Sequence, residues 1–316
     1  MKSTRLRAAL AASLAIGLLA GACGDDDDEA TGETSEATEA TDDTTEGTED
    51  EAGGLEVTLS DEGLDGLPDT FAGGAVEVTF ADERAEGEDG GELNFTSVEE
   101  GTTAEQFAEE FAVVFEGGPF PDFVVANAGV GSADGSAVTS TILLEPGPHV
   151  VWFEEGGGDE EGGSTINGTL VEVTEGEATE LPETDGEIVA VDYGFEITGA
   201  TGPGTFTFRN DGPDQHHHAL VVDFGTNEAS VAEEALPLLV AGDEDAPPPD
   251  VEGFDMGQVD FEFAGTGVFG PGLGGTFEAD FQEGNTYALV CFISDSEGGP
   301  PHAIGMEMYE VFTVGG

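Results

Sequence analysis

Two stretches of this 316-residue chain match each other without a gap, and this internal repeat limits the possible folds more than any other feature. The sequence ELNFTSVEEGTTAEQFAEEF from Glu92 aligns with HHHALVVDFGTNEASVAEEA from His216. Further along, HVVWF at residues 149–153 aligns with ALVCF at residues 288–292. Self-similarity of this kind indicates repeated copies of one structural unit. We therefore expect two copies of one fold.

Each half has the pattern of a β-rich domain. Short runs rich in Val, Phe, Thr and Ile alternate with turns of Gly, Asp and Pro, which is typical of β-sandwiches. Residues 103–115 and 227–240 instead place apolar side chains at helical spacing, with Glu on the other side. The sequence predicts an all-β protein of two tandem Greek-key β-sandwiches, each with one short inserted helix.

The first residues predict export. Lys2, Arg5 and Arg7 precede an apolar run over residues 8–20, and small residues lead to Cys23. This order is that of a signal peptide, here residues 1–22. The segment resembles the lipobox of bacterial lipoproteins, which implies that Cys23 is acylated and anchors the protein to the outer face of the cell membrane. The alternative is ordinary secretion, with Cys23 left in the signal or as a free thiol.

The next segment is too polar and too acidic to form a core. Residues 23–54 carry many Asp, Glu, Thr and Gly residues, and we expect a disordered acidic tether. After it the repeat divides the chain into a first domain over residues 55–175, a linker over 176–186 and a second domain over 187–316.

The charge balance excludes one class of partner. The chain has 70 acidic and 5 basic residues, a net charge of −65. Such a surface repels nucleic acid, so neither DNA nor RNA is expected to bind. The acidity itself resembles that of proteins from salt-loving organisms and says nothing of function. We expect a monomer.

Cysteine usage points to one side chain. The chain has two cysteines, so Cys291 has no partner for a disulfide within the chain if Cys23 is acylated. A lone thiol in an oxidising compartment is a liability unless it is buried or bound to a metal. A buried core cysteine is the simpler alternative.

Four of the five histidines and two methionines accompany Cys291 in the second half: His216, His217, His218, His302, Met306 and Met308. Two imidazoles, one thiolate and one thioether are the ligand set of a blue-copper site. Strand alternation places His218 on the same side as Leu220, Val222 and Phe224, with His217 pointing away. We therefore predict the ligands His218, Cys291, His302 and Met306, with His216 and Met308 in reserve.

These residues carry a resemblance to the cupredoxin family, which includes plastocyanin- and azurin-like proteins. In that family one ligand follows a turn, as in FRNDGPDQHHHALVV, and three lie near the C-terminus, as in GNTYALVCFISDSEGGPPHAIGMEMYEVFTV. Gly284, Tyr287 and Cys291 keep the family's order, and His302 and Met306 keep the spacing of azurin-like proteins. The resemblance implies one copper ion in the second domain. It implies that the first domain is a degenerate cupredoxin-like repeat, which lacks the ligands and binds no metal.

The resemblance implies electron transfer or copper carriage, with an extracytoplasmic redox protein as partner. The chain departs from the small electron carriers in the ten residues between Cys291 and His302, so we expect residues 294–301 to fold back on themselves. No enzyme constellation is found, and we expect no enzymatic activity. The competing interpretation is a metal-free cupredoxin-like module that binds a protein or a ligand.

Overall fold

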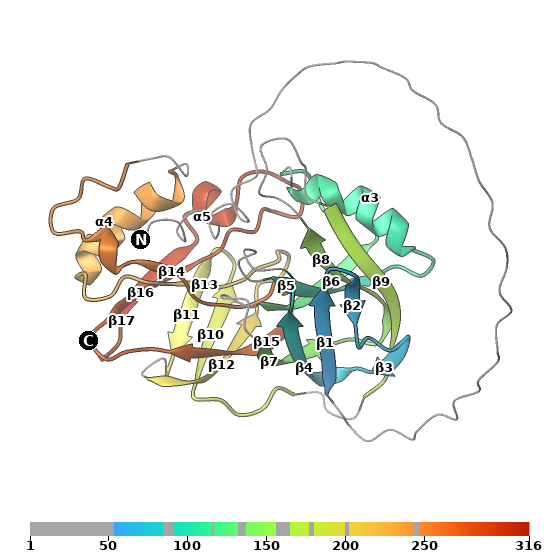
Figure 1. The fold of residues 1–316 in the computed structure, drawn as a ribbon. Coiled ribbons are helices and arrows are strands. Elements are labelled where there is room, and N and C mark those ends of the chain that lie inside the picture. Colours follow the sequence, from blue (N-terminus) through green and yellow to red (C-terminus); the bar gives the residue numbers. More distant parts are fainter. Residues whose placement is uncertain are drawn as a thin grey trace, which may run out of the picture.

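The computed structural model describes residues 54–84, 91–115, 117–131, 137–155, 165–176, 180–199, 202–242 and 247–315. The predicted signal peptide, Cys23 and all of the tether except Gly54 lie outside these ranges. Strands make up most of the fold and helices are few, so the all-β class is confirmed (Figure 1). Within the described ranges, no helix has both the length and the apolar character needed to cross a membrane.

The largest sheet runs through both halves of the chain. It has eight strands in the order β11-β10-β12-β15-β7-β4-β1-β2. In this order the strands are Gly194–Thr198, Gly186–Val191, Pro203–Asn210, Gly274–Asp280, Val138–Leu144, Gly74–Asp82, Leu55–Ser60 and Gly63–Asp65.

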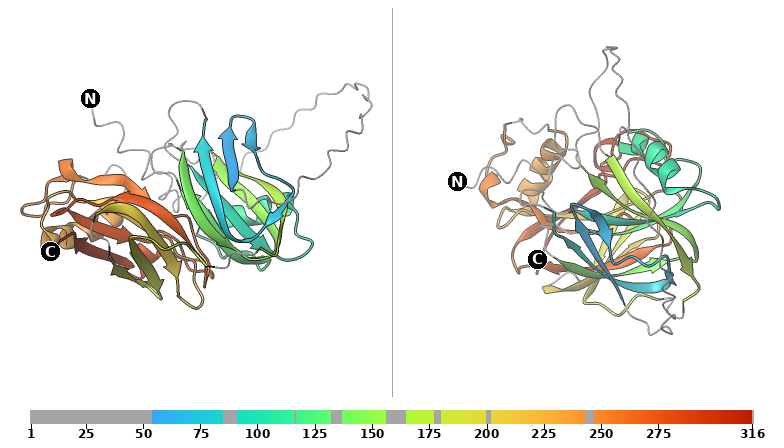
Figure 2. Two further views of the ribbon diagram at one scale, coloured as in Figure 1. Left: turned by 90° about the horizontal axis from the view of Figure 1, so that it is seen from below. Right: turned by 45° about the vertical axis from the view of Figure 1, so that its right-hand side comes forward.

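Two smaller sheets each belong to one half. The five-stranded sheet of the first half has the order β3-β9-β8-β5-β6, with strands Thr70–Ala72, Thr165–Thr174, Gly147–Glu155, Glu92–Val98 and Val124–Gly131. The four-stranded sheet of the second half has the order β14-β13-β16-β17, with strands Asp260–Gly265, Leu220–Asp223, Thr286–Val290 and Tyr309–Thr313. Figure 2 shows the two halves side by side.

The continuous sheet corrects the expectation of two separate sandwiches. Strand β15 of the second half pairs with β7 of the first, at Gly275 and Ile142. A Cβ atom on Gly275 would lie 2.7 Å from the Phe269 ring and 3.0 Å from Ile142, so the missing side chain lets the two edges meet. One hydrophobic core, from Leu55 to Val314, then extends through stacked layers shared by both halves.

The helices cover the outer faces of the two smaller sheets. Helix α3 (Ala104–Phe115) buries Phe107 and Phe111 against Trp152 of β8. Helix α4 (Ala229–Val240) packs on the outer face of the four-stranded sheet. Both lie where the sequence predicted one helix per half, but the second half also has the 3-10 turn η1 (Met256–Gln258) and the one-turn helix α5 (His302–Gly305).

Candidate metal centre

Cys291 directly follows strand β16, and its side chain is completely buried. It belongs to the main core together with Leu289, two residues earlier on the same side of the strand. Its N–H donates to the Met308 carbonyl at 3.2 Å, and its carbonyl accepts from the Ala303 N–H at 2.8 Å. The backbone of Cys291, and with it the sulfur, is therefore held by α5 and by the segment that follows α5.

His302 is the first residue of α5 and is also completely buried. Its backbone N–H donates to the Ile293 carbonyl at 2.8 Å, which brings the start of the helix back to the end of β16. Ring atom Nδ1 lies 3.6 Å from the sulfur of Cys291.

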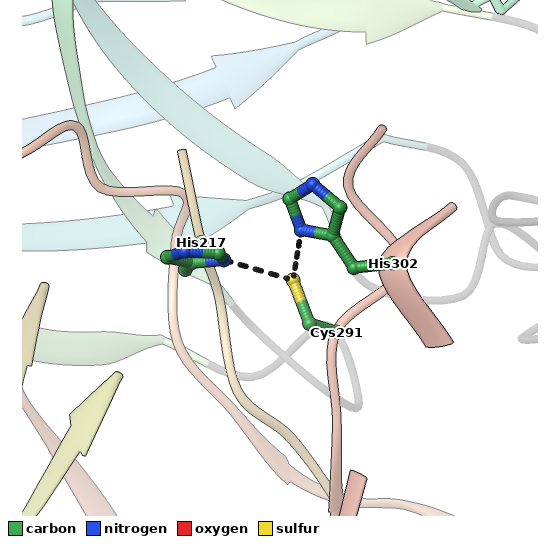
Figure 3. A group of neighbouring side chains, drawn as sticks. All are labelled: His217, Cys291 and His302. Carbon is green, nitrogen blue, oxygen red and sulfur yellow. Dashed lines mark hydrogen bonds between the residues drawn. The ribbon is translucent and has the colours of Figure 1, made fainter. Parts of the chain in front are cut away.

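His217 supplies the second imidazole. It precedes β13, and its N–H and C=O both pair with the backbone of Phe269, at 3.0 and 2.8 Å. Its Nδ1 lies 3.7 Å from the sulfur of Cys291. Figure 3 shows both rings directed toward the sulfur, and the three donor atoms lie within 4.8 Å of one another.

The structure brings His217, and not the predicted His218, to the sulfur of Cys291. The side chain of His218 is held by the backbone, since its Nε2 accepts from the Phe292 N–H at 2.8 Å. Strand alternation did not select the histidine that faces Cys291, because both faces of this sheet are buried. Val222 and Phe224 pack toward α4, whereas Ala219 and Val221 belong to the main core with Cys291. His217 shares the parity of the second pair.

The reserve ligand His216 is also placed elsewhere. Its ring stacks on Phe120 of the first half, with centroids 4.7 Å apart and planes 6° from parallel. Neither ring nitrogen has a hydrogen-bond partner among the described residues. His216 therefore contributes to the contact between the halves.

The two methionines differ in exposure, in the order opposite to that expected of the predicted and reserve ligands. Met306 follows α5 and is 45% exposed, so it lies at the surface rather than in the pocket. Met308 is completely buried, its carbonyl accepts from the Cys291 N–H, and its own N–H donates to the His302 carbonyl at 3.1 Å. Met308 rather than Met306 is buried because the turn at Glu307, with a φ of 55°, breaks the helical spacing after His302.

The long loop between Cys291 and His302 folds back on itself, as expected. Ser294 and Pro301 form a β-bridge across its base. Its tip contacts the first half, because the Gly299 N–H donates to the Gly117 carbonyl at 3.0 Å and the Phe120 N–H donates to the Ser296 carbonyl at 2.9 Å. The first half thus supports the loop that carries one side of the site.

Burial sets the protonation states. It raises the pKa of the Cys291 thiol to about 12, despite the N–H groups of His218 and Ile293 that favour the thiolate. Burial lowers the pKa of His217 to about 3, and it lowers the pKa of His302 although Asp295 acts in the opposite direction. Both imidazoles are neutral at pH 7, so each can offer a nitrogen lone pair. A bound metal ion would displace the thiol proton.

The spacing of the donor atoms fits a metal ion. With metal–sulfur and metal–nitrogen distances of about 2.3 and 2.0 Å, and angles of about 110–120°, sulfur and nitrogen lie about 3.5–3.7 Å apart. The separations of 3.6 and 3.7 Å from the sulfur to the two Nδ1 atoms agree with this range. Among the described residues, these are the three His, Cys, Asp or Glu side chains that come close enough together to hold an ion.

Comparison with known proteins gives structural neighbours only. No family model and no curated protein matches the chain. Dithionite-reduced auracyanin from Roseiflexus castenholzii is 28% identical, covering 41% of this chain and 95% of that chain with a TM-score of 0.23. An azurin from Methylomonas sp. strain J is 14% identical, covering 35% and 88% with a TM-score of 0.19.

A larger neighbour covers most of the chain. A copper nitrite reductase from Nitrosomonas europaea is 10% identical and covers 79% of this chain and 92% of that chain, with a TM-score of 0.19. All of these TM-scores are below 0.25.

Two residues next to the site were missed by sequence reasoning. Oδ1 of Asp295 lies 3.2 Å from Nε2 of His302. The Tyr193 ring packs against the His302 ring, with centroids 5.2 Å apart. Asp295 is one of 70 acidic residues, so composition gave no reason to select it. Tyr193 lies about a hundred residues before Asp295 and His302 in the sequence, and no local pattern connects it to them.

Proposed function

We propose that this protein binds one copper ion between His217, Cys291 and His302 and serves in one-electron transfer. The observation that carries the proposal is the placement of two neutral imidazole nitrogens at 3.6 and 3.7 Å from one buried sulfur. Two imidazoles and one thiolate in a trigonal arrangement are the equatorial ligands of blue-copper centres. Copper, when bound, supplies a one-electron redox couple.

Met308 is the proposed weak axial ligand. It is completely buried, and backbone hydrogen bonds tie it to both Cys291 and His302. A thioether is a soft ligand that suits Cu(I). In this proposal Met308 takes the place predicted for Met306, whose side chain is exposed at the surface.

Electron transfer is favoured over copper carriage by the burial of the ligands. Cys291, His217 and His302 have no exposed surface. A carrier must pass its ion to a partner through open ligands, whereas electrons cross a few ångströms of packed protein. The backbone pairs at His217 and Cys291 also fix the donor positions in advance, which keeps the site unchanged between redox states.

The cellular setting proposed here follows from the sequence. A signal peptide over residues 1–22, an acylated Cys23 and the acidic tether would hold the folded part outside the bacterial membrane. There it would exchange electrons with an extracytoplasmic redox protein, as a monomer and without enzymatic turnover. Two cupredoxin-like repeats, the second carrying the copper, account for the twofold pattern of the chain.

Copper titration of the purified full chain tests the proposal. We expect one Cu(II) ion per chain and an intense blue or green thiolate-to-copper band, and Cys291→Ser should abolish the band. Cys23→Ser is the matched control, since it removes the other cysteine and should keep the colour while releasing the protein from membranes. A wild-type protein that stays colourless and takes up no copper in either redox state would leave the metal-free interaction module as the better interpretation.

A further inference from the structure

The two ring nitrogens of His302 have different neighbours. Nδ1 faces the sulfur of Cys291, and Nε2 lies 3.2 Å from Oδ1 of Asp295. A carboxylate oxygen accepts a hydrogen bond, so Nε2 carries the proton of the neutral ring and Nδ1 keeps its lone pair for a metal. Asp295 therefore selects the tautomer of His302 that can bind.

Tyr193 shares the same carboxylate oxygen. It lies in the turn between β10 and β11, and its hydroxyl donates to Oδ1 of Asp295 at 2.8 Å. Its ring stands nearly perpendicular to that of His302, at a centroid separation of 5.2 Å. Tyr193 is 37% exposed and the Asp295 side chain is 27% exposed, whereas His302 is completely buried, so the Tyr193–Asp295 pair lies on the solvent side of His302.

The second imidazole has no such support. Nε2 of His217 is buried and has no hydrogen-bond partner among the described residues. Among the two imidazoles, only His302 has a hydrogen bond to the Asp295 carboxylate, although the charge of Asp295 also acts on His217 through space. Its position is set by the long loop, where the Gly298 N–H donates to the Asp295 carbonyl at 2.8 Å.

We propose that Asp295 is a positioning residue that lowers the reduction potential of the bound copper through His302, and that Tyr193 moderates it. This inference rests on the proposed copper site. A carboxylate behind a metal-bound histidine makes the imidazole more electron-rich. Its negative charge stabilises the doubly charged Cu(II) more than Cu(I). The Tyr193 hydroxyl draws charge from the same oxygen and so opposes the effect.

Redox titration of the copper-loaded full chain tests the inference with two variants of opposite expected sign. Asp295→Asn should raise the potential, by about 59 mV if the affinity ratio of Cu(I) to Cu(II) changes tenfold. Tyr193→Phe keeps the ring, removes the hydroxyl, and should lower the potential by less. A purely structural disturbance would move both variants in the same direction.

Failure of the inference can be told from failure of the copper site. If the wild type binds no copper, both proposals are overturned. If the wild type and both variants bind one copper ion with the thiolate band but share one potential, or shift in the same direction, the inference alone is overturned. Tyr193→Phe also decides the case if Asp295→Asn does not fold, because it removes one hydroxyl from a partly exposed side chain.

Discussion

Two adjacent histidines have different partners in this fold. His217 directs Nδ1 to the sulfur of Cys291, whereas Nε2 of His218 accepts from the Phe292 N–H. The first is available to a metal ion, and the second satisfies a backbone group that would otherwise lose its hydrogen bond. The difference can be tested by removing each ring separately.

We expect His217→Ala to lose the thiolate-to-copper band and His218→Ala to keep it. His218→Ala should instead lower the free energy of unfolding by about 1–2 kcal/mol, because the Phe292 N–H is left without a partner. Absorption spectra after copper addition and urea unfolding of both variants measure the two effects. Retention of the band by His217→Ala together with its loss in His218→Ala would show that the assignment is reversed.

The sequence could identify Cys291 and His302 but not the other residues of the candidate site. The lone thiol and the spacing to the next histidine are local signals, and the structure brings these two side chains together. The choice among three consecutive histidines depends on which buried face of β13 meets the core. That depends on α4 covering the other face, which is a tertiary contact. Met308 was predicted only as a reserve for a similar reason, since the turn at Glu307 changes the direction of the chain.

The loop over residues 294–301 joins the metal centre to the first half. It approaches the segment around Gly117 so closely that a Cβ atom on Gly298 would lie 2.8 Å from the Gly117 carbonyl oxygen. Gly298 also has a φ of 85°, which other residues rarely adopt. Both conditions favour glycine at this position.

Gly284 provides a matched control for this contact. Its φ is 88°, but a Cβ atom there would meet nothing within 4 Å. We expect Gly298→Ala to lower the free energy of unfolding by about 1–3 kcal/mol more than Gly284→Ala, because only the first adds a clash with the other half. Gly298→Ala should also weaken copper retention. Equal losses in urea unfolding would argue against a docked loop.

At the level of strands and helices, more could be predicted than at the level of the loop. The two inserted helices lie close to their predicted ranges because amphipathic spacing is a local property. The shared eight-stranded sheet was not predicted, since it depends on Gly275 meeting Ile142 across 133 positions of sequence. Sequence alternation describes single strands and contains no information on which edges meet.

The protein as a whole buries its histidines. All five are less than a tenth exposed, and burial lowers the pKa of each. In an unfolded chain each would bind a proton more readily. Stability therefore falls as the pH drops below the ordinary histidine pKa of 6.5.

His149 isolates this effect because it lies in the first half, away from the ligands. It is 2% exposed, and its Nδ1 lies 3.0 Å from the Gly147 carbonyl. For metal-free protein, His149→Gln should reduce the loss of stability below pH 6.5 by up to about 1.4 kcal/mol per pH unit. Urea unfolding at several pH values between 7 and 5 measures the slope. Identical slopes for both proteins would show that burial of His149 does not influence its protonation.

The proposed copper site consists of one sulfur and two imidazoles of the second half. X-ray absorption at the copper edge of the loaded full chain tests it directly, because it identifies the atoms bound to the ion. We expect one sulfur, supplied by Cys291, at a short distance from the copper. We also expect two imidazole nitrogens, supplied by His217 and His302. A first coordination shell of oxygen and nitrogen alone, without sulfur, would show that Cys291 does not bind the ion.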